Sequence, residues 1–315
     1  PLFALKAIGS YAHGAFVCRR NLMDILKAIL MGILQGVTEF LPVSSSGHLS
    51  LFRHFFKVES ETSGLFSAML HIGTLVAVFV AFYRPIYELF CEFIQCIKDI
   101  FAKKFTFNLS KMSPVRRLLF MFVISCVPLL LLLLPVGGGK NVMDAVEVFS
   151  TDNSILAEGI CFIITGFMLL LGTAVTENTA HYRNIGPLTA FFIGVAQFFA
   201  ACFPGISRSG STISTGLCCR VSKKNMVRYS FILSIPAVLA SGLVEFKDAL
   251  KSEEIIPVAP LAVGVVTSAV VGLFAIRLLQ YLLKKNKFKY FGYYCAALGV
   301  IVTVIGIVEK IMGLN

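Results

Sequence analysis

One stretch of apolar sequence, residues 35–48, holds a dense set of polar side chains. It reads Gln-Gly-Val-Thr-Glu-Phe-Leu-Pro-Val-Ser-Ser-Ser-Gly-His and so contains an amide, a carboxylate, three consecutive hydroxyls and an imidazole. Gln35 and Glu39 are four residues apart and share one face if the segment is helical, and Pro42 would end that helix. Because each of these groups is costly to place in hydrocarbon, their clustering inside apolar sequence indicates a functional site.

A second polar stretch, residues 203–212, reads Phe-Pro-Gly-Ile-Ser-Arg-Ser-Gly-Ser-Thr. An arginine flanked by serine and glycine in a loop that opens a helix is typical of a phosphate-binding site, because the guanidinium fork, the hydroxyls and the backbone N–H groups all match phosphate oxygens. The alternative is that Arg208 extends from the end of a hairpin toward the lipid headgroups. The presence of another serine-rich stretch in the same chain favours the phosphate site.

The two stretches together contain the groups that hydrolysis of a phosphoanhydride requires: a guanidinium for the charged oxygens, an acid–base group and a nucleophile. Simpler roles remain open, in which Glu39 pairs structurally with Arg208 and His48 is an ordinary interfacial histidine. Oxygen ligands at Gln35 and Glu39, together with the phosphates, could also hold Mg²⁺ or Ca²⁺. For His71, in a neighbouring apolar segment, packing or hydrogen bonding is favoured over catalysis.

The composition of the chain places it in a membrane. Hydrophobic residues make up 57% of its 315 residues and charged residues 14%, with a mean hydropathy of +0.83, whereas soluble domains are about one-quarter charged. Gly and Pro interrupt the long apolar runs, which is typical of membrane helices rather than of barrel strands. The net charge of +11 fits basic cytoplasmic loops, and no nucleic-acid partner is expected because no aromatic-plus-basic module is present.

Eight apolar segments are long enough to enter or cross a bilayer, which takes about 20 residues. They are residues 22–43, 65–82, 117–136, 155–175, 186–203, 226–246, 257–283 and 290–312. Residues 86–101 carry acidic and amide side chains at helical spacing, which predicts a helix along the membrane interface. The sequence thus predicts an all-α polytopic membrane protein with a single transmembrane domain over residues 21–312, and an extra segment or leader over residues 1–20.

The loops that connect these segments predict their orientation. Lys and Arg gather in loops expected to be cytoplasmic, at 103–117, 220–228 and 284–289. Acidic residues gather in loops expected to be external, at 137–154 and 248–256. The loops on the two sides of residues 186–218, at 176–185 and 219–228, are then both expected to be cytoplasmic. Residues 186–218 must therefore enter and leave the membrane on one side, as a re-entrant hairpin surrounded by protein or water.

The chain also contains an internal repeat. Gln35 and Pro42, with the Ser-Ser-Gly that follows, recur as Gln197 and Pro204 with Arg-Ser-Gly. The two repeats would cover about residues 21–136 and 155–312. An inverted pair of this kind predicts that the two re-entrant hairpins meet near the bilayer midplane and form the functional site there.

These two motifs resemble the signature motifs of the bacterial undecaprenyl-diphosphate phosphatase family, also called the bacitracin-resistance protein. The similarity in hydropathy and spacing covers residues 21–312. It implies a multi-pass enzyme of the bacterial plasma (inner) membrane that converts the C55 isoprenyl diphosphate to its monophosphate, recycles the lipid carrier for peptidoglycan synthesis and confers bacitracin resistance. Its partners would be the polyprenyl diphosphate substrate and membrane lipid, and assembly as a homodimer is left open.

The resemblance also implies roles for individual residues. Catalytic roles fall to Glu39, Ser45, His48 and Arg208. The residues that would bind substrate are Gln35, Ser44, Ser46, Gly47, Ser207, Ser209 and Gly210. Two positions depart from the family pattern. Gln35 stands where many members have Glu, which would weaken a metal site at Gln35 and Glu39, and Ser46 stands where many have Thr.

The mechanism expected from these residues makes Ser45 the nucleophile, with His48 as base and then acid; direct attack by His48 is the alternative. Arg208 and the hairpin hydroxyls would bind the terminal phosphoryl group, and Glu39 would orient His48 or hold the divalent ion. A different function, that of a secondary transporter or a flippase for polyprenyl phosphate, is also compatible with broken inverted repeats. A passive channel is disfavoured, because no ring of identical polar groups is present.

Overall fold

The computed structural model describes most of the chain. The described residues are 24–56, 64–105, 108, 111–137, 140–142, 155–179, 181–203, 205–249, 258–285 and 287–313. The proposed leader, most of the two acidic loops and Pro204 therefore lie outside the described residues. Within these ranges the protein is α-helical, apart from the short antiparallel strands β1 (Pro135–Gly137) and β2 (Lys140–Asn141).

The first described helix covers residues 24–40. It is followed by α2 (Ser45–Phe56), α3 (Gly64–Ala81), α4 (Tyr83–Phe101) and α5 (Pro114–Cys126), which continues as the 3₁₀ helix η1 (Val127–Leu133). The second half contains α7 (Leu156–Glu177), α8 (Pro187–Cys202), α9 (Arg208–Cys218), α10 (Lys223–Ala249), α11 (Val258–Lys284) and α12 (Lys289–Met312). Each of the eight apolar segments expected to enter or cross the membrane overlaps one of these helices.

The protein is an all-α polytopic membrane protein. Among the described residues, five helices are long and apolar enough to cross a bilayer: α5 with η1, α7, most of α10, α11 and α12. A sixth span is present if α3 and α4 are one broken span, since their axes are bent by 88° at Phe82. At 16 residues α8 is shorter than a span, which agrees with the expected re-entrant hairpin. The interfacial position of α4 and the inverted relation of the halves stay predictions.

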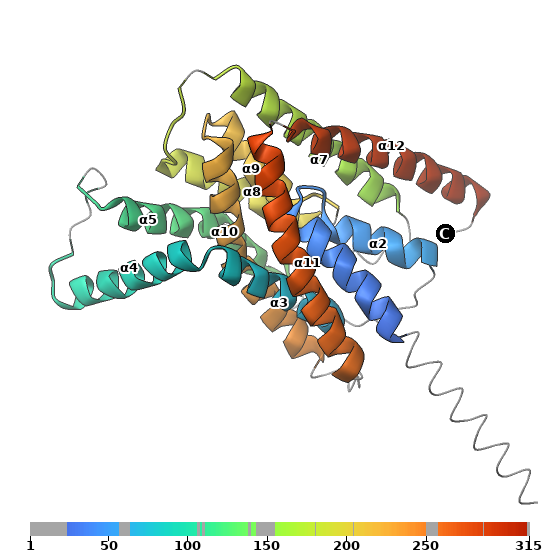
Figure 1. Cartoon of the computed structure of the whole chain (residues 1–315), viewed down its shortest axis with the longest axis horizontal. Coiled ribbons are helices and arrows are strands. Elements are labelled where there is room, and N and C mark those ends of the chain that lie inside the picture. The colour runs from blue at the N-terminus through green and yellow to red at the C-terminus, as the bar shows by residue number, and fades with distance from the viewer. Residues whose placement is uncertain are drawn as a thin grey trace, which may run out of the picture.

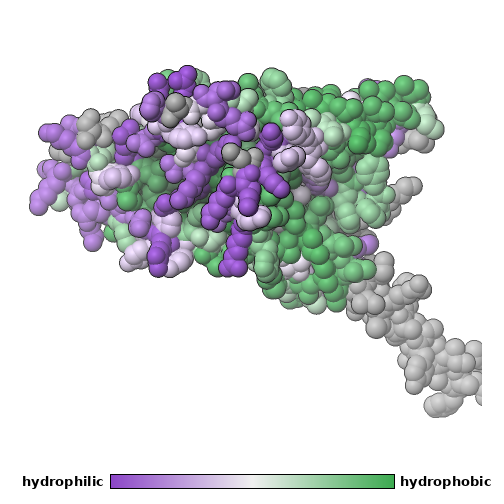
Figure 2. Space-filling view, turned by 45° about the horizontal axis from the view of Figure 1, so that its top comes forward, coloured by the Kyte–Doolittle hydropathy of each residue, from purple (hydrophilic) through white to green (hydrophobic). Residues whose placement is uncertain are grey.

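The long helices pack in pairs. In Figure 1, α12 lies along α7 and α3 lies against α11, while α9 packs between α7, α8 and α10. The α4–α5 pair extends from the rest of the molecule. Figure 2 shows hydrophilic side chains gathered over the end that carries α4 and α5, and hydrophobic side chains over the opposite end.

Glycines bring the paired helices into backbone contact. A Cβ atom on Gly299 of α12 would lie 2.6 Å from the backbone nitrogen of Ile163 in α7, closer than real Cβ contacts allow. Between α3 and α11, a Cβ on Gly73 would lie 2.5 Å from the carbonyl oxygen of Val265. Small residues at such contacts are the usual way in which membrane helices gain van der Waals packing, because lipid supplies no hydrophobic driving force between them.

Candidate active site

The first polar stretch turns from one helix into the next, as Pro42 predicts. The helix over residues 24–40 ends two residues before this proline, and α2 begins at Ser45. Ser44 lies at the turn with φ 72°, in the left-handed region that residues other than glycine seldom adopt. Its hydroxyl accepts a hydrogen bond of 3.3 Å from the Gly47 N–H and so caps α2. A strained backbone held by its own cap is common at functional sites.

The second polar stretch repeats this capping arrangement at the start of α9. Ser207 is its N-cap residue, and its hydroxyl accepts a hydrogen bond of 3.0 Å from the Gly210 N–H. In both loops the capping hydroxyl also lies 3.4 Å from the hydroxyl two residues further on. The repeat seen in the sequence therefore recurs as a local hydrogen-bonding pattern, with Ser44, Ser46 and Gly47 matching Ser207, Ser209 and Gly210.

The two polar loops touch one another. The Gly205 N–H donates to the Ser46 hydroxyl at 3.4 Å, across 159 residues of sequence. Gly47 is packed so tightly against this loop that a Cβ there would lie 3.1 Å from the Gly205 Cα and 2.7 Å from the ring of Phe162, which is fully buried in α7. The absence of a side chain at Gly47 therefore allows the loops to approach.

Gly47→Ala should separate the loops, because the added methyl group has no free space. We expect a loss of about 1–3 kcal/mol in stability from overpacking, together with a clear fall in activity. Thermal unfolding in detergent, followed by the fluorescence of a thiol-reactive dye, measures the first effect. Gly242→Ala is the matched control, because a Cβ at Gly242 meets nothing within 4 Å. Equal melting temperatures for both variants would contradict the close approach.

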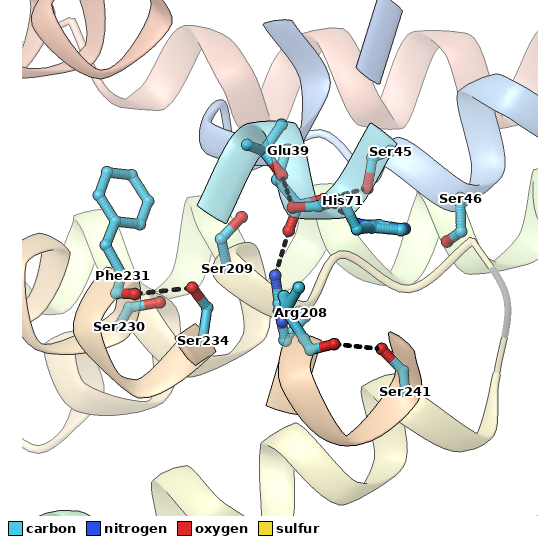
Figure 3. A network of polar contacts seen from close by, with 12 residues as sticks. Glu39, Ser45, Ser46, His71, Arg208, Ser209, Ser230, Phe231, Ser234 and Ser241 are labelled. Atoms are coloured by element: carbon cyan, nitrogen blue, oxygen red, sulfur yellow. Dashed lines mark hydrogen bonds and ion pairs between the residues drawn. The ribbon is translucent and has the colours of Figure 1, made fainter. Parts of the chain in front are cut away.

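A charged network lies where the loops meet (Figure 3). One carboxylate oxygen of Glu39, Oε1, forms an ion pair with Nη2 of Arg208. The other, Oε2, accepts hydrogen bonds from the Ser45 hydroxyl at 2.7 Å and from Nε2 of Gln35 at 3.1 Å. Nδ1 of His71 lies 3.5 Å from the same oxygen and 2.8 Å from Gln35 Nε2. Glu39 is thus the common partner of four polar side chains, which come from its own helix and from α2, α3 and α9.

Burial differs across this network in an ordered way. Gln35 is fully buried and Glu39 is 8% exposed, so the carboxylate lies at the bottom of the site. The side chain of Arg208 is 25% exposed, Ser45 is half-buried and Ser46 is exposed. Figure 3 places further hydroxyls to one side of Arg208, on Ser209 of α9 and on Ser230 and Ser234 of α10. A ligand can therefore reach the guanidinium and the hydroxyls of Ser45 and Ser46, but not the buried amide of Gln35.

His48 is placed differently from the sequence expectation. Its Nδ1 lies 2.7 Å from the Ser44 carbonyl oxygen, which can only accept, so this nitrogen carries the proton. Its Nε2 then accepts from the Tyr294 hydroxyl of α12 at 2.7 Å, and the ring packs edge-on against Phe162. Glu39 therefore contacts His71, while His48 faces α7 and α12.

Two residues around the site were missed or underweighted from sequence. His71 was expected to have only a packing or hydrogen-bonding role, and it does form hydrogen-bonding contacts, but within the charged network itself. An imidazole in an otherwise apolar helix was the available signal. Nothing in the sequence marks Tyr294, since it is one of several tyrosines near the start of an apolar segment.

The oxygen ligands for a divalent cation are few. Glu39 already has partners on both carboxylate oxygens, whereas the buried Oε1 of Gln35 has no hydrogen-bond partner among the residues that the structure describes. Within the described part of the chain, no group of three or more His, Cys, Asp and Glu side chains is arranged to hold a metal ion. Gln35 and Glu39 could therefore offer a hard cation two oxygens at most, and substrate phosphates and water would have to supply the others.

Comparison with known proteins places these residues in a family context. A family model described as "Bacitracin resistance protein BacA" matches residues 28–301. A protein named undecaprenyl-diphosphatase from Methanosphaera stadtmanae is 35% identical over 288 residues, which cover 91% of this chain and 100% of that protein. Proteins of the same name from Halothermothrix orenii and Bacteroides fragilis are 32% and 35% identical, over 90% of this chain and 98% of each relative. The matched region contains both polar loops.

Proposed function

The chain belongs to the family of the bacitracin resistance protein BacA, and from that premise we propose that it hydrolyses undecaprenyl diphosphate to undecaprenyl phosphate and inorganic phosphate. The observation that carries this proposal is the carboxylate of Glu39, which binds the guanidinium of Arg208 through one oxygen and the hydroxyl of Ser45 through the other. A cation for phosphate, a nucleophile and a base for that nucleophile thus form one connected group.

Arg208 binds the terminal phosphate. Only its Nη2 contacts Glu39, and among the described residues its Nε and Nη1 have no partner. Because the side chain is partly exposed, these nitrogens are available for the forked hydrogen bonds that guanidinium makes to phosphate oxygens. The prenyl tail stays in the bilayer, beside the apolar helices.

Ser45 attacks the terminal phosphorus. Its proton passes to Glu39 Oε2, to which the hydroxyl already donates at 2.7 Å. As the Oγ–P bond forms, the bond from this phosphorus to the bridging oxygen breaks, and the electron pair leaves with undecaprenyl phosphate. Glu39 takes the role of base that the sequence assigned to His48, since His48 is bonded to Ser44 and Tyr294.

Water then releases the phosphate from the phosphoserine. One proton of the water returns to Ser45 Oγ by way of Glu39, and the other stays on the departing phosphate. Before water attacks, the proton taken up in the first step passes through His71, whose Nδ1 lies 3.5 Å from Glu39 Oε2, and on to solvent. His71 therefore returns Glu39 to the ionised state that the second step needs.

We also propose that the protein and the diphosphate together bind a divalent ion, Mg²⁺ or Ca²⁺. Gln35 Oε1 and Glu39 would hold it, with the remaining positions filled by phosphate oxygens and water. When bound, it would neutralise charge on the diphosphate.

Gln35→Glu should lower the Mg²⁺ concentration needed for half-maximal phosphate release by about tenfold, because a second carboxylate adds a charged ligand. A titration of activity after chelator treatment measures this. The same substitution at Gln197, the matching residue of the other repeat, is the control, since Gln197 is not among the hydrogen-bond and ion-pair partners of Glu39 in the described part of the chain. An unchanged half-maximal concentration would remove Gln35 from the ion site.

The decisive experiment measures phosphate release from undecaprenyl diphosphate by protein purified in detergent. A phosphatase is active under these conditions, whereas a transporter or flippase has no membrane to work across. Absence of phosphate release from folded protein, with and without added Mg²⁺ or Ca²⁺, would overturn the proposal. We further propose that the enzyme works in the bacterial plasma membrane, where it recycles the lipid carrier for peptidoglycan synthesis and confers bacitracin resistance; the family supports this assignment. A homodimer remains a prediction.

A further inference from the structure

A cavity of about 440 Å³ lies away from the catalytic network, between α4, α5 and α10. Its volume falls within the range of small-molecule sites. Neither Glu39 nor Arg208 lines it. The cavity is part of the α4–α5 end of the molecule, where hydrophilic side chains gather in Figure 2.

The polar part of the cavity is cationic. Arg117 of α5 and Arg228 of α10 line it, together with the amides of Asn184 and Asn225 and one carboxylate, Glu88. Arg117 Nε is buried and has no hydrogen-bond partner, and neither arginine is in an ion pair with any described carboxylate. Two guanidinium groups against one carboxylate leave a net positive charge for an anionic ligand.

Arg117 differs in its partners from the arginine next to it on α5. Arg116, one position earlier on α5, donates to Glu92 at 2.5 Å and to Asp99 at 2.7 Å, both on α4. These two carboxylates of α4 therefore pair with Arg116 and not with Arg117. Arg117 lines the cavity instead, and its buried Nε has no hydrogen-bond partner among the described residues.

The rest of the lining is mainly apolar, and its inner part is buried. Leu89, Met121, Tyr229 and Ile232 are each less than 9% exposed. Arg117 is the fourth residue of its candidate span and Arg228 the sixth of its own, so both lie where an apolar helix begins. That is the depth of lipid headgroups, and basic pockets between helices at this depth bind phosphate-bearing lipids.

We propose that this cavity binds a lipid with a phosphate headgroup, separately from the catalytic site. Arg117 and Arg228 hold the phosphate through forked hydrogen bonds, and the amides of Asn184 and Asn225 add neutral donors. The first carbons of the tail lie on the apolar wall. Anionic phospholipid and undecaprenyl phosphate share this chemistry, whereas free phosphate could use only the cationic part.

Native mass spectrometry of the purified protein tests the proposal with three probes: phosphatidylglycerol, undecaprenyl phosphate and inorganic phosphate. The double variant Arg117→Gln, Arg228→Gln should bind the lipids at least about tenfold more weakly than the wild type, while phosphate release from the diphosphate stays unchanged. Arg277→Gln is the matched control, because Arg277 is an exposed arginine of α11 outside the cavity. Unchanged lipid binding by the double variant would overturn the proposal.

A second variant keeps the test valid if loss of two positive charges impairs membrane insertion. Leu118→Trp fills the apolar side of the cavity without changing the charge. It should weaken binding of both lipids and leave any binding of inorganic phosphate as it was. Binding of both lipids identifies a general anionic-lipid site, and binding of undecaprenyl phosphate alone identifies a product site; either supports the proposal. Binding of inorganic phosphate without either lipid would refute it.

Discussion

Arg208→Ala should lower the rate of phosphate release from undecaprenyl diphosphate by about 10³-fold or more. The guanidinium is the cationic side chain next to Glu39 and Ser45 that a ligand can reach, and it stabilises charge on the phosphoryl oxygens as the bond breaks. Arg208→Lys should recover only part of the activity, because an ammonium group keeps the charge but loses the fork. Phosphate release in detergent, with substrate varied at fixed enzyme, measures both.

The control for this prediction separates catalysis from folding. Removing the guanidinium also leaves the buried carboxylate of Glu39 without its counter-ion, which destabilises a protein on its own account. The double variant Arg208→Ala, Glu39→Gln should therefore melt at a higher temperature than Arg208→Ala and remain inactive. Arg277→Ala should behave as wild type. Near-normal hydrolysis by folded Arg208→Ala protein would exclude the phosphate-binding role.

Ser45→Ala should abolish the covalent phosphoenzyme and reduce phosphate release by about 10³-fold or more, because the nucleophile is lost. Ser46→Ala is the matched comparison: it removes a neighbouring hydroxyl that is expected to bind substrate and not to attack it, and whose contacts are the 3.4 Å bonds to Ser44 and Gly205. We expect this variant to release phosphate more slowly but still to form the phosphoenzyme. Rapid quenching with labelled substrate traps the intermediate.

The same experiment decides between the serine and the histidine. Phosphoserine survives acid and is lost in base, whereas phosphohistidine is lost in acid. His48→Ala should still form the acid-stable species, since His48 contacts Ser44 and Tyr294 rather than Ser45. An acid-labile intermediate that persists in Ser45→Ala and disappears in His48→Ala would show that the histidine is the nucleophile.

Local chemistry was predictable from the sequence. The four-residue spacing of Gln35 and Glu39 placed them on one face, and they are hydrogen-bonded to each other. Pro42 predicted the helix end. The loops on both sides of residues 186–218 predicted a re-entrant hairpin there, and this stays a prediction. The repeat predicted that the two polar loops meet, and Arg208 does contact Glu39 across 169 residues of sequence.

Which histidine contacts Glu39 was less predictable from the sequence. His48 lies three residues after Ser45 on α2 and would share its face, but its ring is fixed by Ser44, Phe162 and Tyr294, which belong to the loop and to two distant helices. Periodicity describes one helix and not the rotation at which another packs against it. For that reason the sequence assigned the acid–base role to the nearer histidine, while packing brings His71 to the carboxylate.

The glycine contacts between helices have a consequence for how the molecule can move. Backbones that touch without intervening side chains cannot slide without losing their packing, so α7 must travel with α12 and α3 with α11. Gly36 joins the Glu39 helix to α11, and Gly172 joins α7 to the α9 helix that carries Arg208. The helices that carry Glu39 and Arg208 therefore belong to different packed blocks. The Glu39–Arg208 ion pair and the Ser46–Gly205 hydrogen bond both connect the two polar loops. An opening between the loops that lets a bulky lipid headgroup in or out would break and remake both contacts.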